Sequence, residues 1–136
     1  MPISYAHFNL MPESIWQWNH FTPRELACPH CFEIKIEPRL VDLLESVRLI
    51  YGAPITIASG YRCPTHNTAI KGAENSPHLR GTAVDPKDPG NGPARYKMIR
   101  AFFNAGFEGF GMGDGKLHFD IDSLGMRAWH YPRIGA

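Results

Sequence analysis

Hydrophobic residues recur at helical spacing in two stretches of the chain. In residues 37–51 the apolar side chains stand three or four positions apart, with charged residues between them: Leu40, Leu43, Leu44, Val47 and Ile50. Residues 94–105 repeat this pattern with Tyr96, Ile99, Phe102 and Phe103. Such spacing places the apolar side chains on one face of a helix. Gly52 and Gly106 follow the two stretches and can end a helix in a left-handed turn.

Shorter apolar runs predict strands. Residues 55–58 and 79–86 are typical of short buried strands, residues 107–112 form a glycine-rich strand, and 127–131 form a last one. Residues 116–122 alternate: Leu117, Phe119 and Ile121 fall on one face, and His118, Asp120 and Asp122 on the other. Helices come early and hairpin-like strands late. We therefore predict an α+β domain in which a small antiparallel sheet is flanked by helices.

The remaining segments predict turns, loops and one further helix. Residues 1–20 form an aromatic-rich lead that we expect to be irregular. Thr22 as N-cap, Pro23 at the first helical position and Glu25 at the third predict a short helix that ends near Pro29. Residues 59–71 are typical of a loop or broken helix, and residues 88–93 of a loop. The length of 136 residues fits one domain, spanning residues 1–136.

Composition and charge narrow the class of protein. Hydrophobic residues make up 43% and charged residues 20%, an ordinary globular balance. Because the net charge is +1 and no basic block occurs, we expect no nucleic-acid partner. No apolar run approaches the about 20 residues that span a bilayer, so we expect no membrane span. The N-terminus lacks the basic and apolar regions of a signal peptide, so synthesis in the cytoplasm is expected.

Three cysteines do not predict a disulfide framework, because an odd number leaves one unpaired. The run Cys28-Pro-His-Cys31 is compatible with a redox pair or with half of a zinc knuckle. A knuckle needs a second ligand pair, and only Cys63 remains, far downstream. The pattern therefore favours two thiols in a turn between helical segments. A redox role, a pair that oxidises outside the cell, or a metal or redox protein centred on these cysteines remain alternatives.

The segment from Ser76 to Asp85, SPHLRGTAVD, carries the sharpest chemical signal. His78 lies just before a predicted strand and Asp85 at its far end, with the small residues Gly81 and Ala83 between them. Imidazole nitrogen and carboxylate oxygen are ligands of first-row metals, and small neighbours let a metal and its water approach. The spacing alone leaves a second interpretation open, namely a loop histidine and a strand-ending aspartate.

The predicted strand around His118 carries a second signal. His118, Asp120 and Asp122 share one strand face. A histidine with a carboxylate two positions away suits a metal ligand and the group that orients it. A solvated strand face is the alternative interpretation of the same row.

Three blocks of sequence, SGYRCPTHN at 59–67, SPHLRGTAVD at 76–85 and HFD at 118–120, together resemble the M15 family of zinc peptidases. That family includes D-alanyl-D-alanine carboxypeptidases, peptidoglycan endopeptidases and phage endolysins. FTPRELACP at 21–29 and RAW at 127–129 extend the resemblance over roughly residues 20–132. The resemblance implies a single zinc peptidase domain with a hedgehog/DD-peptidase-like fold.

The resemblance also implies a site. His78, Asp85 and His118 would hold one zinc ion and leave a fourth position for a water that the metal activates. Arg62, in the SGYR block, would stabilise the developing oxyanion or hold a substrate carboxylate. A structural salt bridge is the alternative for Arg62. Ser76 would lie beside the site and contact substrate or a ligand.

The general base departs from the family pattern. Many members place an acidic residue three positions before the last histidine ligand, where this chain has Gly115. Because glycine tolerates unusual backbone angles, a one-residue shift would let Asp114 serve. Asp120 is the second candidate and Glu108 the third. The Gly-Asp-Gly sequence is equally good hairpin-turn chemistry without a catalytic role.

The function implied by the resemblance is hydrolysis of peptide bonds in bacterial peptidoglycan stem peptides by a metal-activated water. The protein would be a D,D-carboxypeptidase or an endopeptidase. We expect a monomer that acts at the bacterial cell wall, with phage- or prophage-type release as one route. The alternative is a catalytically inactive, zinc-containing binding or structural module of the same fold, because residue 115 is not acidic.

Overall fold

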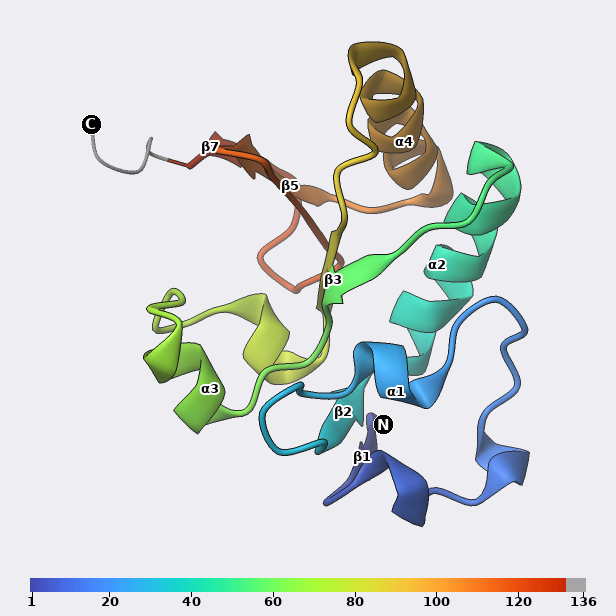
Figure 1. The fold of residues 1–136 in the computed structure, drawn as a ribbon, viewed down its shortest axis with the longest axis vertical. Helices are drawn as coiled ribbons and strands as arrows, with labels where there is room; N and C mark the ends of the chain where they lie inside the picture. The colour runs from blue at the N-terminus through green and yellow to red at the C-terminus, as the bar shows by residue number, and fades with distance from the viewer. Residues whose placement is uncertain (132–136) are drawn as a thin grey trace.

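Residues 1–131 are described by the computed structural model, and they form two small sheets with four α-helices around them (Figure 1). The helices are α1 (Pro23–Leu26), α2 (Pro38–Tyr51), α3 (Pro64–Ala69) and α4 (Gly92–Ala105). Three 3-10 turns accompany them, η1 (Phe8–Leu10), η2 (Glu13–Ile15) and η3 (Pro77–Arg80). The strands are β1 (Ile3–Tyr5), β2 (Ile34–Ile36), β3 (Ile57–Ser59), β4 (Ala83–Pro86), β5 (Gly109–Gly113), β6 (Lys116–Asp120) and β7 (Arg127–His130).

The larger sheet has the strand order β3-β4-β6-β5-β7. Its neighbours pair antiparallel, except that β7 runs parallel to β5. The α+β class with a mainly antiparallel sheet is therefore confirmed. Figure 1 shows α2 and α4 together on the right of this sheet and α3 on its left.

The two long helices form as the periodicity predicts. Gly52, with φ of 77°, and Gly106, with φ of 116°, end them in the left-handed conformation. Their buried stripes differ from the prediction, because Ile50, Tyr96 and Phe103 are 47%, 68% and 44% exposed. The buried positions keep four predicted residues, Leu40, Leu44, Val47 and Phe102, and add Val41 and Tyr51 of α2 and Met98 and Ala101 of α4. This set also has helical spacing, rotated around α4 from the predicted stripe.

Strand β6 is buried on both faces, so the polar side chains of one face lie inside the protein. On one face Phe119 stacks on Phe102 of α4, with ring centroids 3.9 Å apart. Because side chains alternate along a strand, His118 and Asp120 point to the other face. The aromatic stack thus anchors β6 against α4 and leaves its histidine and aspartate directed away from that helix.

Several local predictions were wrong. The lead of residues 1–20 contains β1, which pairs with the unpredicted strand β2 in the register Ile3↔Ile36. The expected strand 79–86 begins only at Ala83, because residues 77–80 form η3, in which Pro77 takes the first position. Residues 64–69 form α3, in agreement with the helical alternative for residues 59–71. The strand expected at 55–58 runs from 57 to 59.

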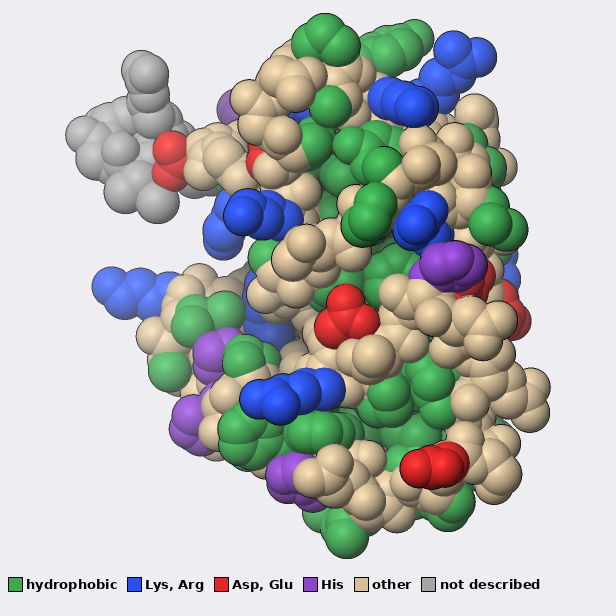
Figure 2. All heavy atoms as spheres, turned by 45° about the vertical axis from the view of Figure 1, so that its right-hand side comes forward, with side chains coloured by type: hydrophobic (Ala, Val, Ile, Leu, Met, Phe, Trp, Pro, Cys, Tyr) green, Lys and Arg blue, Asp and Glu red, His purple; other side chains and the backbone are tan. Residues whose placement is uncertain are grey.

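The surface carries mixed charges. On the face drawn in Figure 2, lysine and arginine side chains are scattered, and acidic and histidine side chains lie among them. This distribution fits the net charge of +1. Among the helices of residues 1–131, none has the length and apolar character needed to cross a membrane.

Candidate metal centre

Three ligand-type side chains converge from three separate elements. His78 comes from η3, Asp85 from β4 and His118 from β6. Asp85 Oδ1 lies 3.0 Å from His78 Nε2 and 3.0 Å from His118 Nδ1. The two ring nitrogens are 3.2 Å apart. Ala83 pairs with Asp120, which places β4 beside β6. This register of the sheet brings His78 and His118 together, although they are 40 positions apart in the sequence.

The second nitrogen of each ring has its own partner. His78 Nδ1 lies 2.6 Å from the carbonyl oxygen of Gly60, and His118 Nε2 lies 2.7 Å from Asp120 Oδ2. A carbonyl or carboxylate oxygen only accepts hydrogen bonds, so each of these nitrogens carries the proton. The nitrogens that face Asp85 are then free to offer lone pairs. This is the arrangement in which outer partners fix the tautomers of metal-binding histidines.

Electrostatics favour a cation at the point of convergence. Burial lowers the pKa of His78, and the hydrogen bond to Asp85 opposes this only in part. Burial disfavours charged His118, yet its bonds to Asp120 and Asp85 raise its pKa. Burial also disfavours ionised Asp85, but the two histidines outweigh it and hold the pKa of Asp85 far below its usual range. An ionised carboxylate and two lone pairs within about 3 Å need a shared proton or a metal ion between them.

The donor set fits zinc. Ligand atoms bound at about 2.0–2.1 Å to one tetrahedral ion stand about 3.3 Å apart. The three donor atoms are 3.0 to 3.2 Å apart, close to that spacing. Three protein ligands of the His/His/carboxylate type leave one position open, which is typical of a catalytic rather than a structural site. His78, Asp85 and His118 are therefore brought together as one candidate metal centre.

Arg62 is held rigidly beside this centre. Its guanidinium is buried, and it donates from Nη2 to Asp85 Oδ2 at 3.0 Å and from Nε to Ser59 Oγ at 3.0 Å. A third donor, Nη1, reaches Asn67 Oδ1 at 3.4 Å. Arginine has five N–H donors, so two remain for a substrate. The salt bridge that was the alternative interpretation of Arg62 is therefore present, with Asp85 as its partner. It still leaves N–H donors of the guanidinium free for a substrate.

Asp120 orients His118 from inside the protein. Its side chain is fully buried, and Oδ2 also accepts a hydrogen bond from Arg127 Nη2 at 2.8 Å. Gly109 on β5 makes room for this carboxylate, since a Cβ at that position would stand 2.3 to 2.4 Å from its carboxyl atoms. The absence of a side chain at position 109 is thus a requirement of the metal centre.

Gly109→Ala is expected to displace the Asp120 carboxylate and to lower the free energy of unfolding by about 1–3 kcal/mol, the usual cost of overpacking. Metal affinity should fall with it, because His118 loses its orienting partner. Gly92→Ala is the matched control, since a Cβ there meets nothing within 4 Å. Denaturant unfolding and zinc titration of both variants check this. Equal behaviour of the two would contradict the role given to Gly109.

Asp122, just after β6, binds η3 through hydrogen bonds. Its buried carboxylate accepts hydrogen bonds from Arg80 Nε at 2.8 Å and from Thr82 Oγ1 at 2.9 Å. Burial disfavours the ionised form, but these two donors outweigh it and lower the pKa of Asp122. Because His78 lies in η3, this contact helps to position one metal ligand.

Asp122→Asn is expected to cost about 2 kcal/mol of unfolding free energy at neutral pH. A carboxyl with a lowered folded-state pKa stabilises the protein above its unfolded pKa and loses that effect as pH falls through the folded pKa. The difference between wild type and variant should therefore shrink in acid. Urea unfolding at about pH 7 and about pH 3 measures it. A difference that grows in acid would show that ionised Asp122 is not stabilising.

Two cavities meet at the metal centre. One, of about 360 Å³, is lined by His78, His118, Ser76, Trp129 and Tyr131 among others. The other, of about 450 Å³, extends past His66 and Lys87. Arg62, Asp85 and Lys116 line both. A peptide lying in this groove would cross the metal centre with one part on either side.

The other predicted residues are placed as follows. Ser76 is buried, and its Oγ accepts a hydrogen bond from the backbone N–H of His78 at 3.2 Å. Asp114 lies exposed in the turn between β5 and β6, with φ of 51°, and it lines neither of the two cavities. Glu108 is exposed just before β5. The catalytic roles of Asp114 and Asp120 remain predictions.

Four contributors to the site were not predicted from the sequence. The Gly60 carbonyl contacts the His78 ring, and Arg127 donates to Asp120, which contacts the His118 ring. Lys116 and Tyr131 line the groove. A backbone carbonyl leaves no signature in a sequence. Arg127 belongs to the RAW run at 127–129, which the family resemblance singled out. Its role became clear only from the structure, in which β7 pairs with β5.

The domain thus combines an α+β fold with three convergent ligand-type side chains that could hold a metal ion. The sequence profile of the Peptidase M15 family matches residues 19–122. The chain therefore belongs to the M15 family of peptidases, as its sequence motifs predict, and membership implies a peptidase. A comparison with curated proteins found no match.

Proposed function

We propose that this protein is a zinc-dependent peptidase that hydrolyses peptide bonds in the stem peptides of bacterial peptidoglycan. The observation that carries the proposal is the convergence of His78, Asp85 and His118, each ring with its other nitrogen already paired, inside an M15 domain. Zinc held there would polarise the scissile carbonyl and lower the pKa of a bound water towards about 7. Under this proposal the protein acts as a monomer at the cell wall.

The chain's own residues supply orientation and charge. Asp120 and the Gly60 carbonyl keep the histidine tautomers that face the metal. Arg62 lies in both cavities with two free N–H donors, so it can stabilise the oxyanion that develops on the scissile carbonyl or hold a substrate carboxylate. Its buried contacts fix the guanidinium before substrate arrives, which reduces the cost of ordering it.

The charge of the groove supports a substrate that carries carboxylates. Arg62, Lys71 and Lys116 line the cavity that holds both histidines, and Asp85 is the one acid among its described lining residues. Once Asp85 binds a metal, the charged side chains left along that cavity are the basic Arg62, Lys71 and Lys116. Stem peptides carry free carboxylates on their side chains and at their ends, so they complement this wall.

Digestion of purified peptidoglycan, followed by mass spectrometry of the muropeptides, tests the proposal. Zinc-loaded protein is expected to change the muropeptide pattern, and a chelator should abolish the change because the metal supplies the activated water. Loss of a terminal D-alanine would indicate a carboxypeptidase, whereas cleavage within stems or cross-bridges would indicate an endopeptidase. An unchanged pattern across several wall types would exclude peptidoglycan as the substrate.

A zinc-containing binding module of the same fold is the second candidate. It is favoured by one observation, that Asp114 does not line the described cavities. Asp114→Ala separates the two functions when the wild type is tested beside it. An active wild type with an inactive variant supports the peptidase with Asp114 as its proton shuttle. An active variant removes Asp114 from the mechanism, and an inactive wild type that still binds wall fragments supports the binding module.

A further inference from the structure

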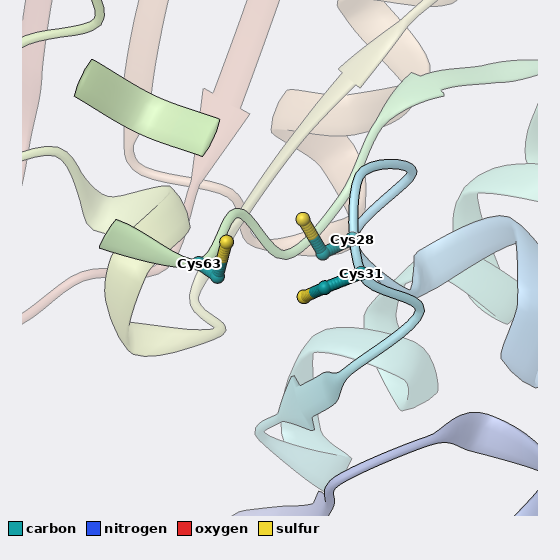
Figure 3. A group of neighbouring side chains, drawn as sticks. All are labelled: Cys28, Cys31 and Cys63. Carbon is teal, nitrogen blue, oxygen red and sulfur yellow. The ribbon is translucent and has the colours of Figure 1, made fainter. Parts of the chain in front are cut away.

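A second cluster of ligand-type side chains lies away from the groove. Cys28 and Cys31 lie in the loop after α1, and Cys63 directly precedes α3. Their sulfur atoms all lie within 4.8 Å of one another, and the three side chains face a common space in Figure 3. All three are free thiols. Cys28 and Cys31 thus lie in a loop, close to the predicted turn, and folding brings the distant Cys63 to them.

The backbone around these sulfurs is held by hydrogen bonds. The N–H of His66 donates to the sulfur of Cys63 at 3.3 Å. The loop itself is closed by a hydrogen bond of 2.8 Å from the Phe32 N–H to the Cys28 carbonyl oxygen. These contacts fix the backbone that carries the three sulfur atoms.

We propose that Cys28, Cys31 and Cys63 bind a second metal ion, zinc by ligand preference, in a closed structural site. Three thiolates and one imidazole form a common structural zinc set. His30 is a candidate for the fourth ligand, because its Nδ1 lies 3.9 Å from the Cys63 sulfur. Because a disulfide would use two sulfurs and leave the third unpaired, one metal ion accounts better for a cluster of three.

The site would join two segments that carry the groove. Cys28 and Cys63 are buried, and the Tyr61 N–H donates to the carbonyl of Leu26 at 2.9 Å, so the two segments already lie in contact. Cys63 follows Arg62, whose guanidinium contacts Asp85. A metal at the cysteines would hold the α1–β2 loop to the start of α3 and thereby position Arg62. This inference does not depend on the proposed function.

Metal content and cobalt spectra test it in the full-length protein. Wild type should bind two ions, while His78→Ala should bind one and keep a near-ultraviolet thiolate-to-cobalt charge-transfer band. Cys31→Ser should lose that band and the corresponding ion, and His130→Ala serves as a control for loss of an exposed histidine. A His78→Ala protein that binds no ion, or one without a thiolate band, would overturn the proposal while leaving the groove centre untouched.

A measurement on the wild type avoids variants that fail to fold. Zinc-loaded protein should react with a thiol reagent at least about tenfold more slowly than protein treated with a strong chelator, because coordinated thiolates are protected. Equal reactivity of three thiols in both samples would overturn the proposal. So would a disulfide between two of the cysteines in protein purified with zinc.

Discussion

Replacing His78 with alanine is expected to remove the groove metal and to lower peptidase activity at least about a thousandfold, because metal activation supplies several kcal/mol of transition-state stabilisation. His78 is 1% exposed, and its Nε2 is one of three atoms that define the centre. Asp85 and His118 alone would leave too few protein ligands for a catalytic zinc ion. Metal analysis and muropeptide release measure the two effects.

His130→Ala is the control for this substitution. His130 is exposed on β7 and is not one of the three converging side chains, so its removal should leave groove metal and activity unchanged. Zinc loss and inactivity confined to His78→Ala would support the assignment. Full activity of His78→Ala in zinc-depleted buffer would contradict it.

Asp120→Asn is expected to weaken zinc binding about 10- to 100-fold, since partners of metal-bound histidines tune affinity by that amount. The amide keeps the shape of the carboxylate but loses its charge beside His118 and Arg127. Breaking this buried pair should also lower the free energy of unfolding by about 3 kcal/mol. Zinc titration and denaturant unfolding of the purified variant give both numbers.

Asp114→Asn is the matched control, because it removes the charge of an aspartate that is exposed in a turn. Its zinc affinity and stability should equal those of wild type, whatever its activity. If Asp120→Asn bound zinc like wild type, the hydrogen bond between Asp120 and His118 would not orient the histidine. The orienting role given to Asp120 would then be wrong.

The parts of the fold that sequence predicts well are those with a strong local period. The helix at 37–51 and the alternating strand at 116–122 were found because their apolar residues recur at 3.6 and 2.0 positions. Strands β1 and β2 are three residues long, too short for a period to appear, and each is fixed by its partner in the sheet. The turn η3 was hidden because its residues adjoin a genuine strand.

The site likewise combines features that the sequence predicts with features that only the folded chain defines. His78, Asp85 and His118 could be singled out from motif resemblance, but their meeting point depends on the pairing of β4 with β6. The role of Gly109 cannot be predicted from the sequence, because it depends on the Asp120 carboxylate occupying the space where a side chain at position 109 would stand. Cys63 shows the same limit, since 32 positions separate it from Cys31 and only the folded chain joins them.

Anomalous diffraction at the zinc edge, from crystals grown with zinc, shows directly whether a zinc ion binds in the groove. We expect a peak about 2.0–2.1 Å from His78 Nε2, His118 Nδ1 and a carboxylate oxygen of Asp85. A second peak among the three cysteine sulfurs would support the structural site as well. A map with no peak between the two histidines, from protein that cleaves peptidoglycan in the same zinc buffer, would contradict the assignment of the catalytic metal.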